Sequence, residues 1–212
     1  MLTVKVLVFN SFQENTYLLS DESKNCILID PGMNSPNEQT ALIEYIKQND
    51  LIPQAMINTH CHIDHVLGCN FVKTKYQIPF YIHQKETPIL DNVVGFGEFF
   101  GMQVEIPPAP DRYLNQGDSF VFGNSEIQIL HVPGHSPGSI ALYSVKDNII
   151  LTGDVLFRGS IGRTDLPGGD FQTLINHIKS KLLVLPRDII VYPGHGPHTT
   201  IGDEYDTNPF LN

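Results

Sequence analysis

The sequence has few basic residues, and it contains no long apolar run. Only 13 of its 212 residues are lysine or arginine, against 23 aspartates and glutamates, which gives a formal net charge of −10. Nucleic acid and anionic membranes bind basic surfaces, so an acidic chain is a poor partner for either. No apolar stretch approaches membrane-spanning length, and the N-terminus lacks the charged-then-apolar order of a secretory signal. We therefore expect a cytoplasmic protein.

Cysteine is also scarce, with three residues in the chain. Three cysteines do not form an even disulfide framework, and a chain of this length does not need one. Cys26 lies inside an apolar run and is expected in the core. Cys61 stands between two histidines that we consider metal ligands, so its side chain should point away from them. A redox pair of Cys61 with Cys69 is the alternative.

Three common catalytic motifs are missing as well. The sequence has no G-x-S-x-G elbow of a serine hydrolase and no G-x-x-x-x-G-K-[ST] phosphate loop. It also has no G-x-G-x-x-G after a predicted strand. The chemistry must therefore come from another source.

Ligands of the kind that bind metals are what the sequence has instead. Four apolar runs, at residues 55–57, 127–130, 149–151 and 189–192, are each followed by a short turn and then by histidine or aspartate. Apolar, β-branched runs of this length are typical of buried strands. Ligands just past several strand ends would meet along one sheet edge, on loops that a rigid scaffold holds. The candidates are His60, His62, Asp64, His65, His135, Asp154 and His195.

The densest part of this set is the H-x-H-x-D-H stretch at residues 60–65. In an extended chain, residues two apart point to the same side, so His60, His62 and Asp64 are expected to face one cavity. His65 is expected to turn in from the start of the following helix. The alternative is a solvated, histidine-rich turn, which the three later strand-turn-ligand segments disfavour.

The number and type of ligands predict a pair of metal ions. Seven ligands exceed the four of a structural zinc site, and two ions bridged by a carboxylate and a water fit the count. Imidazoles and carboxylates suit zinc, iron or manganese, and we take zinc as the first choice. The ions would make a hydroxide at neutral pH and polarise a carbonyl group.

The order of predicted elements indicates the fold. Two strand-rich halves, each with helices, predict an α/β/β/α sandwich in one domain over residues 1–212. Predicted strands cover 2–9, 16–19, 26–30, 54–58, 80–82, 118–122, 125–132, 139–144, 148–152 and 188–192, and predicted helices cover 41–50, 71–76 and 171–184. The stretch 87–110 fits neither pattern. It is either a lid over the site, or a packed surface loop or oligomer contact.

Taken together, these motifs resemble the metallo-β-lactamase superfamily. The residues that carry the resemblance are His60-x-His62-x-Asp64-His65, the segment 133–139, Gly153-Asp154 and the segment 192–195. Segments 153–157, 159–170 and 199–210 are similar to its glyoxalase II-like (hydroxyacylglutathione hydrolase-like) branch. The resemblance implies the α/β/β/α fold. It also implies that one metal takes His60, His62 and His135, that the other takes Asp64, His65 and His195, and that Asp154 bridges them.

The resemblance further implies a thioester hydrolase in which a metal-bridging hydroxide attacks the thioester carbonyl, with Asp64 and Asp154 as catalytic carboxylates. Glyoxalase II proper has an extra C-terminal helical domain that contacts glutathione, and this sequence does not show it. Two alternatives stay open. One is a persulfide dioxygenase with a single iron on His60, His135 and Asp154, and the other is a metal-binding protein without catalysis.

Arg163 is the candidate substrate-binding residue. By resemblance it stands where the family has a lysine, while the family's nearby tyrosine is replaced by Asp165. A fixed cation beside the metals would attract an anionic thioester to this acidic protein. Alternatively, Arg163 pairs with Asp165 or Asp170, because arginine is the usual partner of carboxylates. We expect a small-molecule substrate and a monomer or small homo-oligomer.

Overall fold

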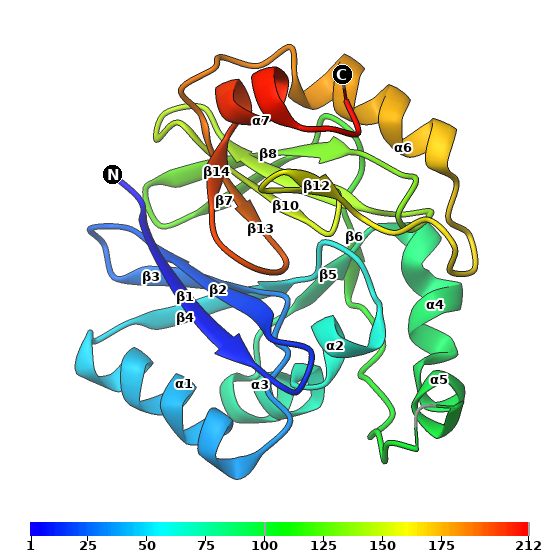
Figure 1. Cartoon of the computed structure of the whole chain (residues 1–212). Helices are drawn as coiled ribbons and strands as arrows, with labels where there is room; N and C mark the ends of the chain where they lie inside the picture. Colours follow the sequence, from blue (N-terminus) through cyan, green and yellow to red (C-terminus); the bar gives the residue numbers. More distant parts are fainter. Residues whose placement is uncertain (100, 212) are drawn as a thin grey trace.

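Two six-stranded sheets packed face to face form the centre of the molecule (Figure 1). The structure is a computed structural model, and it describes residues 1–99 and 101–211. The first sheet contains, in spatial order, β1 (Thr3–Phe9), β2 (Glu14–Ser20), β3 (Asn25–Ile29), β4 (Ile52–Ile57), β5 (Phe80–Ile82) and β6 (Arg112–Tyr113). The second contains β14 (Thr199–Thr200), β13 (Ile190–Pro193), β10 (Ile149–Gly153), β9 (Ile140–Ser144), β8 (Ser125–His131) and β7 (Ser119–Phe122).

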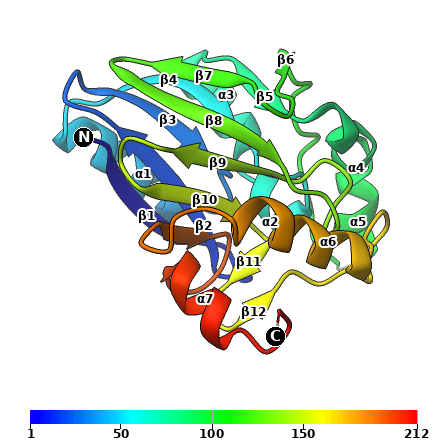
Figure 2. The same cartoon turned by 90° about the horizontal axis from the view of Figure 1, so that it is seen from above.

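Helices cover the outer face of each sheet, which gives four layers (Figure 1). On the first sheet lie α1 (Pro36–Gln48), α3 (Cys69–Tyr76), α4 (Thr87–Asp91) and α5 (Val93–Phe99). On the second lie α6 (Phe171–His177), its π-helical continuation η2 (Ile178–Leu182) and α7 (Ile201–Thr207). In the view from above (Figure 2), α6 and α7 lie along the β10 side of the second sheet. The α/β/β/α prediction is thus confirmed.

Strand β3 of the first sheet is buried on both faces, which explains its apolar sequence. In β3, Leu28 packs against the helices, while Ile27 and Ile29 pack against the second sheet. Side chains alternate between the two faces of a strand, so one strand serves two cores. The packed core between the sheets holds them at a fixed separation, and this separation also fixes the positions of the loops at the strand ends.

Strand direction brings the ligand loops to one edge. β9 runs antiparallel to both β8 and β10, and β10 runs parallel to β13. The ends of β8, β10 and β13 therefore lie on the same side of the second sheet. The loop after β4 reaches them from the first sheet, because the Ile140 N–H donates to the Thr59 carbonyl at 2.9 Å.

All ten predicted strands are present. The elements that the sequence did not predict are short: β6, β14, the hairpin of β11 (Leu156–Phe157) and β12 (Ser160–Ile161), the 3-10 turn η1 (Gln84–Glu86), and the helices α2 (Ile63–Val66), α4, α5 and α7. Elements of two to seven residues are too short for a clear periodic pattern of apolar and polar residues. Among the described residues, no helix is long and apolar enough to cross a membrane.

The stretch 87–110 begins with two packed helices, α4 and α5, instead of an irregular loop. Ile89, Leu90 and Val93 are buried in the outer core of the first sheet. This segment is thus packed against the core, and its role as a lid over the site stays a prediction. Phe100 lies outside the described residues. Gly95 and Gly97 lie within α5 and weaken its helical signal in the sequence.

Candidate metal centre

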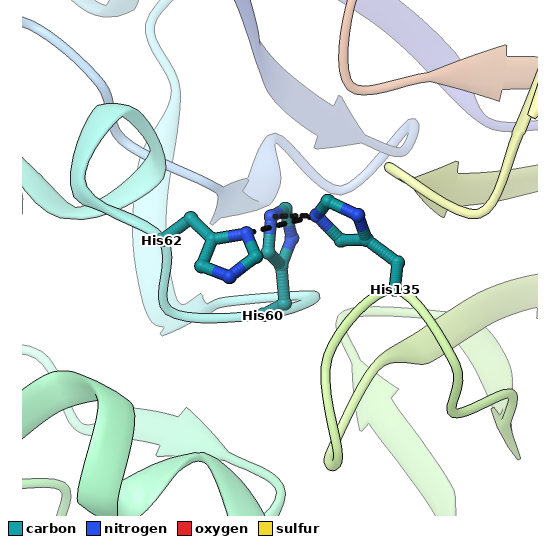
Figure 3. A group of neighbouring side chains, drawn as sticks. All are labelled: His60, His62 and His135. Carbon is teal, nitrogen blue, oxygen red and sulfur yellow. Dashed lines mark hydrogen bonds between the residues drawn. The ribbon is translucent and has the colours of Figure 1, made fainter. Parts of the chain in front are cut away.

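Three imidazoles converge between the two sheets (Figure 3). His60 and His62 lie in the loop after β4, and His135 lies in the turn after β8. His135 Nε2 is 2.8 Å from His62 Nδ1 and 3.2 Å from His60 Nε2. Ligand atoms of all three lie within 4.8 Å of one another. Three nitrogens aimed at one point match the protein ligands of an open tetrahedral metal site. These residues are called the first group below.

A second group consists of Asp64, His65 and His195, whose ligand atoms also lie within 4.8 Å of one another. Asp64 Oδ2 is 3.1 Å from His195 Nε2 and 3.6 Å from His65 Nε2. Asp64 and His65 belong to α2, and His195 follows β13. One carboxylate and two imidazoles are a common ligand set for a divalent ion.

Asp154, at the end of β10, lies between the two groups. Its Oδ2 is 3.8 Å from His135 Nε2 and 3.5 Å from His195 Nε2. Its Oδ1 is 3.5 Å from His65 Nε2. Both Asp154 Oδ1 and His65 Nε2 are buried and make no hydrogen bond within the described part of the chain. Buried polar atoms are costly unless they are satisfied, and a divalent cation between these two atoms would satisfy both. The donor set therefore fits metal.

Asp64 lines the same cavity as His62, as expected, but the chain at Asp64 is helical instead of extended. A one-turn helix, α2, begins directly after His62, which is its N-cap residue. Asp64 therefore lies on a helix beside His65 and joins the second group, while His60 and His62 join the first. α2 is also separate from α3, so His65 does not come from the start of the longer helix.

Four of the five histidines of the centre also have a polar contact on the ring nitrogen Nδ1, which faces away from the other candidate ligands. No such contact is described for His62. Such contacts fix the ring orientation and tautomer of a metal ligand. They are Thr59 Oγ1 to His60 Nδ1 (3.1 Å), Asp30 Oδ2 to His65 Nδ1 (3.2 Å), the Arg163 carbonyl to His135 Nδ1 (2.7 Å) and the Phe12 carbonyl to His195 Nδ1 (3.1 Å). The site is thus oriented by contacts from four different segments.

The protonation of the first group and of Asp154 favours metal binding. Burial lowers the pKa of His62 to about 3, and it also lowers the pKa of His60 and His135 below their usual values. Neutral imidazoles have free lone pairs for a metal. Burial would raise the pKa of Asp154, but the nearby His65 overcomes that effect and holds the pKa below its ordinary value. Asp154 therefore stays an ionised carboxylate.

Arg163 forms an ion pair with Asp165, which the sequence suggested as the alternative to substrate binding. Its Nε and Nη2 donate to the two carboxylate oxygens of Asp165, each at 2.7 Å. Asp170 is not involved: it caps α6 by accepting from Thr173 N. The carbonyl of Arg163 accepts a hydrogen bond from His135 Nδ1, so the main chain of this residue orients a candidate ligand.

A cavity of about 230 Å³ opens beside both groups. Ile89, Val93 and Phe96 of α4 and α5 form one apolar wall, and Arg163 and Leu166 lie elsewhere in its lining. A lid over the site was one alternative for the stretch 87–110, but the sequence did not predict the two helices that form this wall. Asp30 also follows a strand end, as the other candidate ligands do. Its contact with His65 Nδ1 joins residues distant in the sequence, so only the structure reveals it.

The cysteines behave as the core residues that the sequence suggested. Cys26, Cys61 and Cys69 are all free and buried. Burial raises the pKa of Cys61 and Cys69 well above the usual thiol value. Thiols in this state are unreactive, and the redox pair is not formed.

Known proteins have a similar fold and a similar sequence. The family model of the metallo-β-lactamase superfamily matches residues 10–195. The chain belongs to the metallo-β-lactamase superfamily. It is 38% identical over 213 residues to hydroxyacylglutathione hydrolase GloC of Haemophilus influenzae, an alignment that covers 100% of this chain and 99% of the relative.

Two solved structures are similar over nearly the whole chain. The BLEG-1 B3 metallo-β-lactamase has a TM-score of 0.92 and 39% identity, covering 99% of this chain and all of that one. TTHA1623 in a di-iron-bound form has a TM-score of 0.88 and 39% identity, covering 98% of this chain and all of that one. The chain is thus a metallo-hydrolase of this superfamily, and its fold implies divalent metal binding.

Gly194 provides a test of this geometry. A Cβ there would overlap Asp154 Oδ1 and lie 2.8 Å from His65 Cε1. We expect Gly194→Ala to displace both side chains and to weaken metal binding about tenfold or more. Metal content after dialysis and competitive chelator titration would measure this.

Gly196→Ala is the matched control. It lies two residues further along, where a Cβ meets nothing within 4 Å and only the backbone, at φ +72°, is strained. This control should lower stability by about 1–2 kcal/mol and leave metal affinity unchanged. Equal metal affinity in the two variants would contradict the close approach of Gly194 to the ligands.

Proposed function

We propose that this metallo-hydrolase is a binuclear thioester hydrolase. The observation that carries the proposal is the position of Asp154, whose carboxylate reaches candidate ligands of both groups at 3.5–3.8 Å. The similarity to a hydroxyacylglutathione hydrolase over the full chain supports a thioester as the substrate. When bound, two ions, zinc first and iron or manganese as alternatives, would lower the pKa of a water and polarise the carbonyl.

The side chains of this centre have separate roles in the proposal. His60, His62 and His135 would hold one ion, and Asp64, His65 and His195 the other, with Asp154 as a ligand of both. Asp64 lines the cavity and stays ionised, because His65 outweighs burial and lowers its pKa. As an ionised acceptor, it would orient the attacking water toward the substrate carbonyl.

No side-chain nucleophile takes part in this proposal. The thiol of Cys61 is buried and protonated, since burial raises its pKa. The hydroxyl of Ser136, next to His135, donates to Glu86 at 2.6 Å and lies 2.7 Å from Ser139 Oγ. Ser136 does not line the cavity beside the metal centre, and the Cys61 thiol stays protonated, so neither group is placed or activated for attack. Direct attack by water is therefore the simplest mechanism.

The cavity favours a substrate with an apolar group and an anionic group. The apolar part would pack on Ile89, Val93 and Phe96, and the anionic part would approach Arg163. The ion pair of Arg163 does not prevent this, because the Arg163 and Asp165 side chains are 61% and 68% exposed. Pairs that exposed contribute about 0–1 kcal/mol, so an anionic substrate can replace Asp165 as the partner of Arg163.

β-Lactam hydrolysis is the second candidate function. It is favoured by the 39% identity and TM-score of 0.92 with a B3 metallo-β-lactamase. A β-lactam also presents a carbonyl to a nucleophilic water. The persulfide dioxygenase alternative needs only His60, His135 and Asp154, and it leaves the second group without a use.

Metal content tests the two-ion assignment. We expect about two ions per purified chain, by elemental analysis. Asp154→Ala should lose both, since the carboxylate reaches both groups, while the exposed control Asp165→Ala should keep both. An Asp154→Ala protein that still holds two ions would disprove the bridging role.

Activity assays separate the candidate reactions. We expect hydrolysis of thioesters, followed by release of free thiol, with weaker turnover of β-lactams and no oxygen uptake with persulfides. Cys61→Ser and Cys69→Ser should remain active, because no thiol nucleophile is used. Loss of turnover in either variant with metal retained would indicate covalent catalysis, and oxygen uptake would favour the dioxygenase.

Substrate capture by Arg163 is tested by a pair of variants. Arg163→Ala should lower kcat/KM for anionic thioesters about tenfold, mainly through KM, and should spare neutral ones. Asp165→Asn, which frees the guanidinium, should lower KM for the same anionic substrates. If Arg163→Ala affects neutral and anionic substrates equally and lowers the melting temperature, Arg163 instead holds its own loop.

A further inference from the structure

Glu86 is a fully buried carboxylate beside the metal centre, at the end of the η1 turn that follows β5. It belongs to neither group of candidate ligands. Its Oε2 accepts a hydrogen bond from Cys61 N at 2.8 Å. Its Oε1 accepts from Ser136 Oγ and from Gly138 N, each at 2.6 Å. A buried carboxylate with three such contacts is fully engaged with its surroundings.

These contacts join the two loops that carry the first group. Cys61 lies between His60 and His62, and Ser136 directly follows His135. One loop comes from the first sheet and the other from the second, so a single carboxylate connects the two halves of the sandwich at the metal ligands. We propose that Glu86 is a positioning residue that sets the spacing of His60, His62 and His135 and thereby the metal affinity of the first group.

The contact geometry requires a carboxylate at this position. Each oxygen of Glu86 accepts from a main-chain N–H, and an N–H cannot turn round to become an acceptor. In Glu86→Gln, one of these N–H groups would face the amide NH₂, whichever way the amide is turned. The loop also approaches closely, since a Cβ on Gly138 would lie 2.7 Å from Glu86 Cγ.

The effect should be confined to the first group. Among the described residues, Glu86 has no hydrogen bond to the segments that orient the second group. Those are Asp30, behind His65, and the Phe12 carbonyl, behind His195. A residue that only stabilises the fold would act on both groups alike, so selectivity separates positioning from general stability.

Glu204 offers a matched control. It is buried to a similar extent, 1% exposed, and its carboxylate also accepts three hydrogen bonds. The donors are Gly159 N, Thr199 Oγ1 and Asn208 Nδ2, none of them next to a candidate metal ligand. Glu204→Gln therefore perturbs a buried carboxylate without touching either ligand loop.

The test is a titration of metal-free protein with cobalt(II), followed by its visible absorption and by chelator competition. In Glu86→Gln, the affinity for one of the two cobalt ions should fall about 10–100-fold, as is typical when a hydrogen bond that orients a metal ligand is lost. The affinity for the other ion should stay at its wild-type value. Glu204→Gln should leave both affinities unchanged, because its contacts lie away from both ligand loops.

Background variants identify the affected group. In a His195→Ala protein, in which the second group is disabled, adding Glu86→Gln should lower the affinity for the cobalt ion that still binds. With the first disabled by His62→Ala, it should change nothing further. If Glu86→Gln does not fold, Ser136→Ala removes one of its three contacts and should produce a smaller loss in the same equivalent.

Two results would overturn the assignment: equal weakening of both equivalents, or no weakening of either. If the wild-type protein binds a single ion, the binuclear proposal fails, but the His195→Ala background still tests Glu86 on the first group. The outcomes for thioester hydrolysis are independent, because the titration requires no substrate.

Discussion

The packing of one sheet on the other is the constraint on which the metal centre depends. Candidate ligands come from the end of β4 in the first sheet and from the ends of β8, β10 and β13 in the second. Hydrogen bonds between the sheets fix this arrangement: Tyr17 OH and Asn15 Nδ2 both donate to the Pro193 carbonyl, two residues before His195. The apolar core between the sheets sets the separation, and these polar contacts set the register.

Charge is the second organising factor. The centre places Asp30, Asp64, Asp154 and Glu14 near one another with little exposure to solvent. Buried carboxylates are unfavourable unless they are paired, and metal ions are the largest positive charges that such a site can hold. Burial raises the pKa of the Glu14 carboxyl well above its usual value, which shows how strongly this region disfavours unpaired negative charge. Metal binding and the stability of this region are therefore coupled.

The parts of the fold that the sequence could predict are those with local signals. Residues of β3 and β4 that are buried on both faces of the sheet form apolar runs in the sequence, and the candidate ligands stand in short turns after such runs. Contacts between distant segments have no such signal. Glu86 lies in a Gln-Lys-Glu turn without any pattern, and the role of Asp30 depends on a ring 35 positions further along the chain. The position of Asp64 differed for a local reason, because a helix starts one residue after His62.

The wall of the cavity and the metal ligands belong to separate parts of the chain. Ile89, Val93 and Phe96 come from α4 and α5, whereas the candidate ligands come from the strand ends and α2. Substitutions of these three side chains would therefore reshape the cavity without replacing a candidate ligand. Such a division would allow the lining of the cavity to change in evolution while the candidate ligands stay the same. Relatives with names as different as hydroxyacylglutathione hydrolase and B3 metallo-β-lactamase, at 38% and 39% identity to the same chain, are the outcome that this separation would produce.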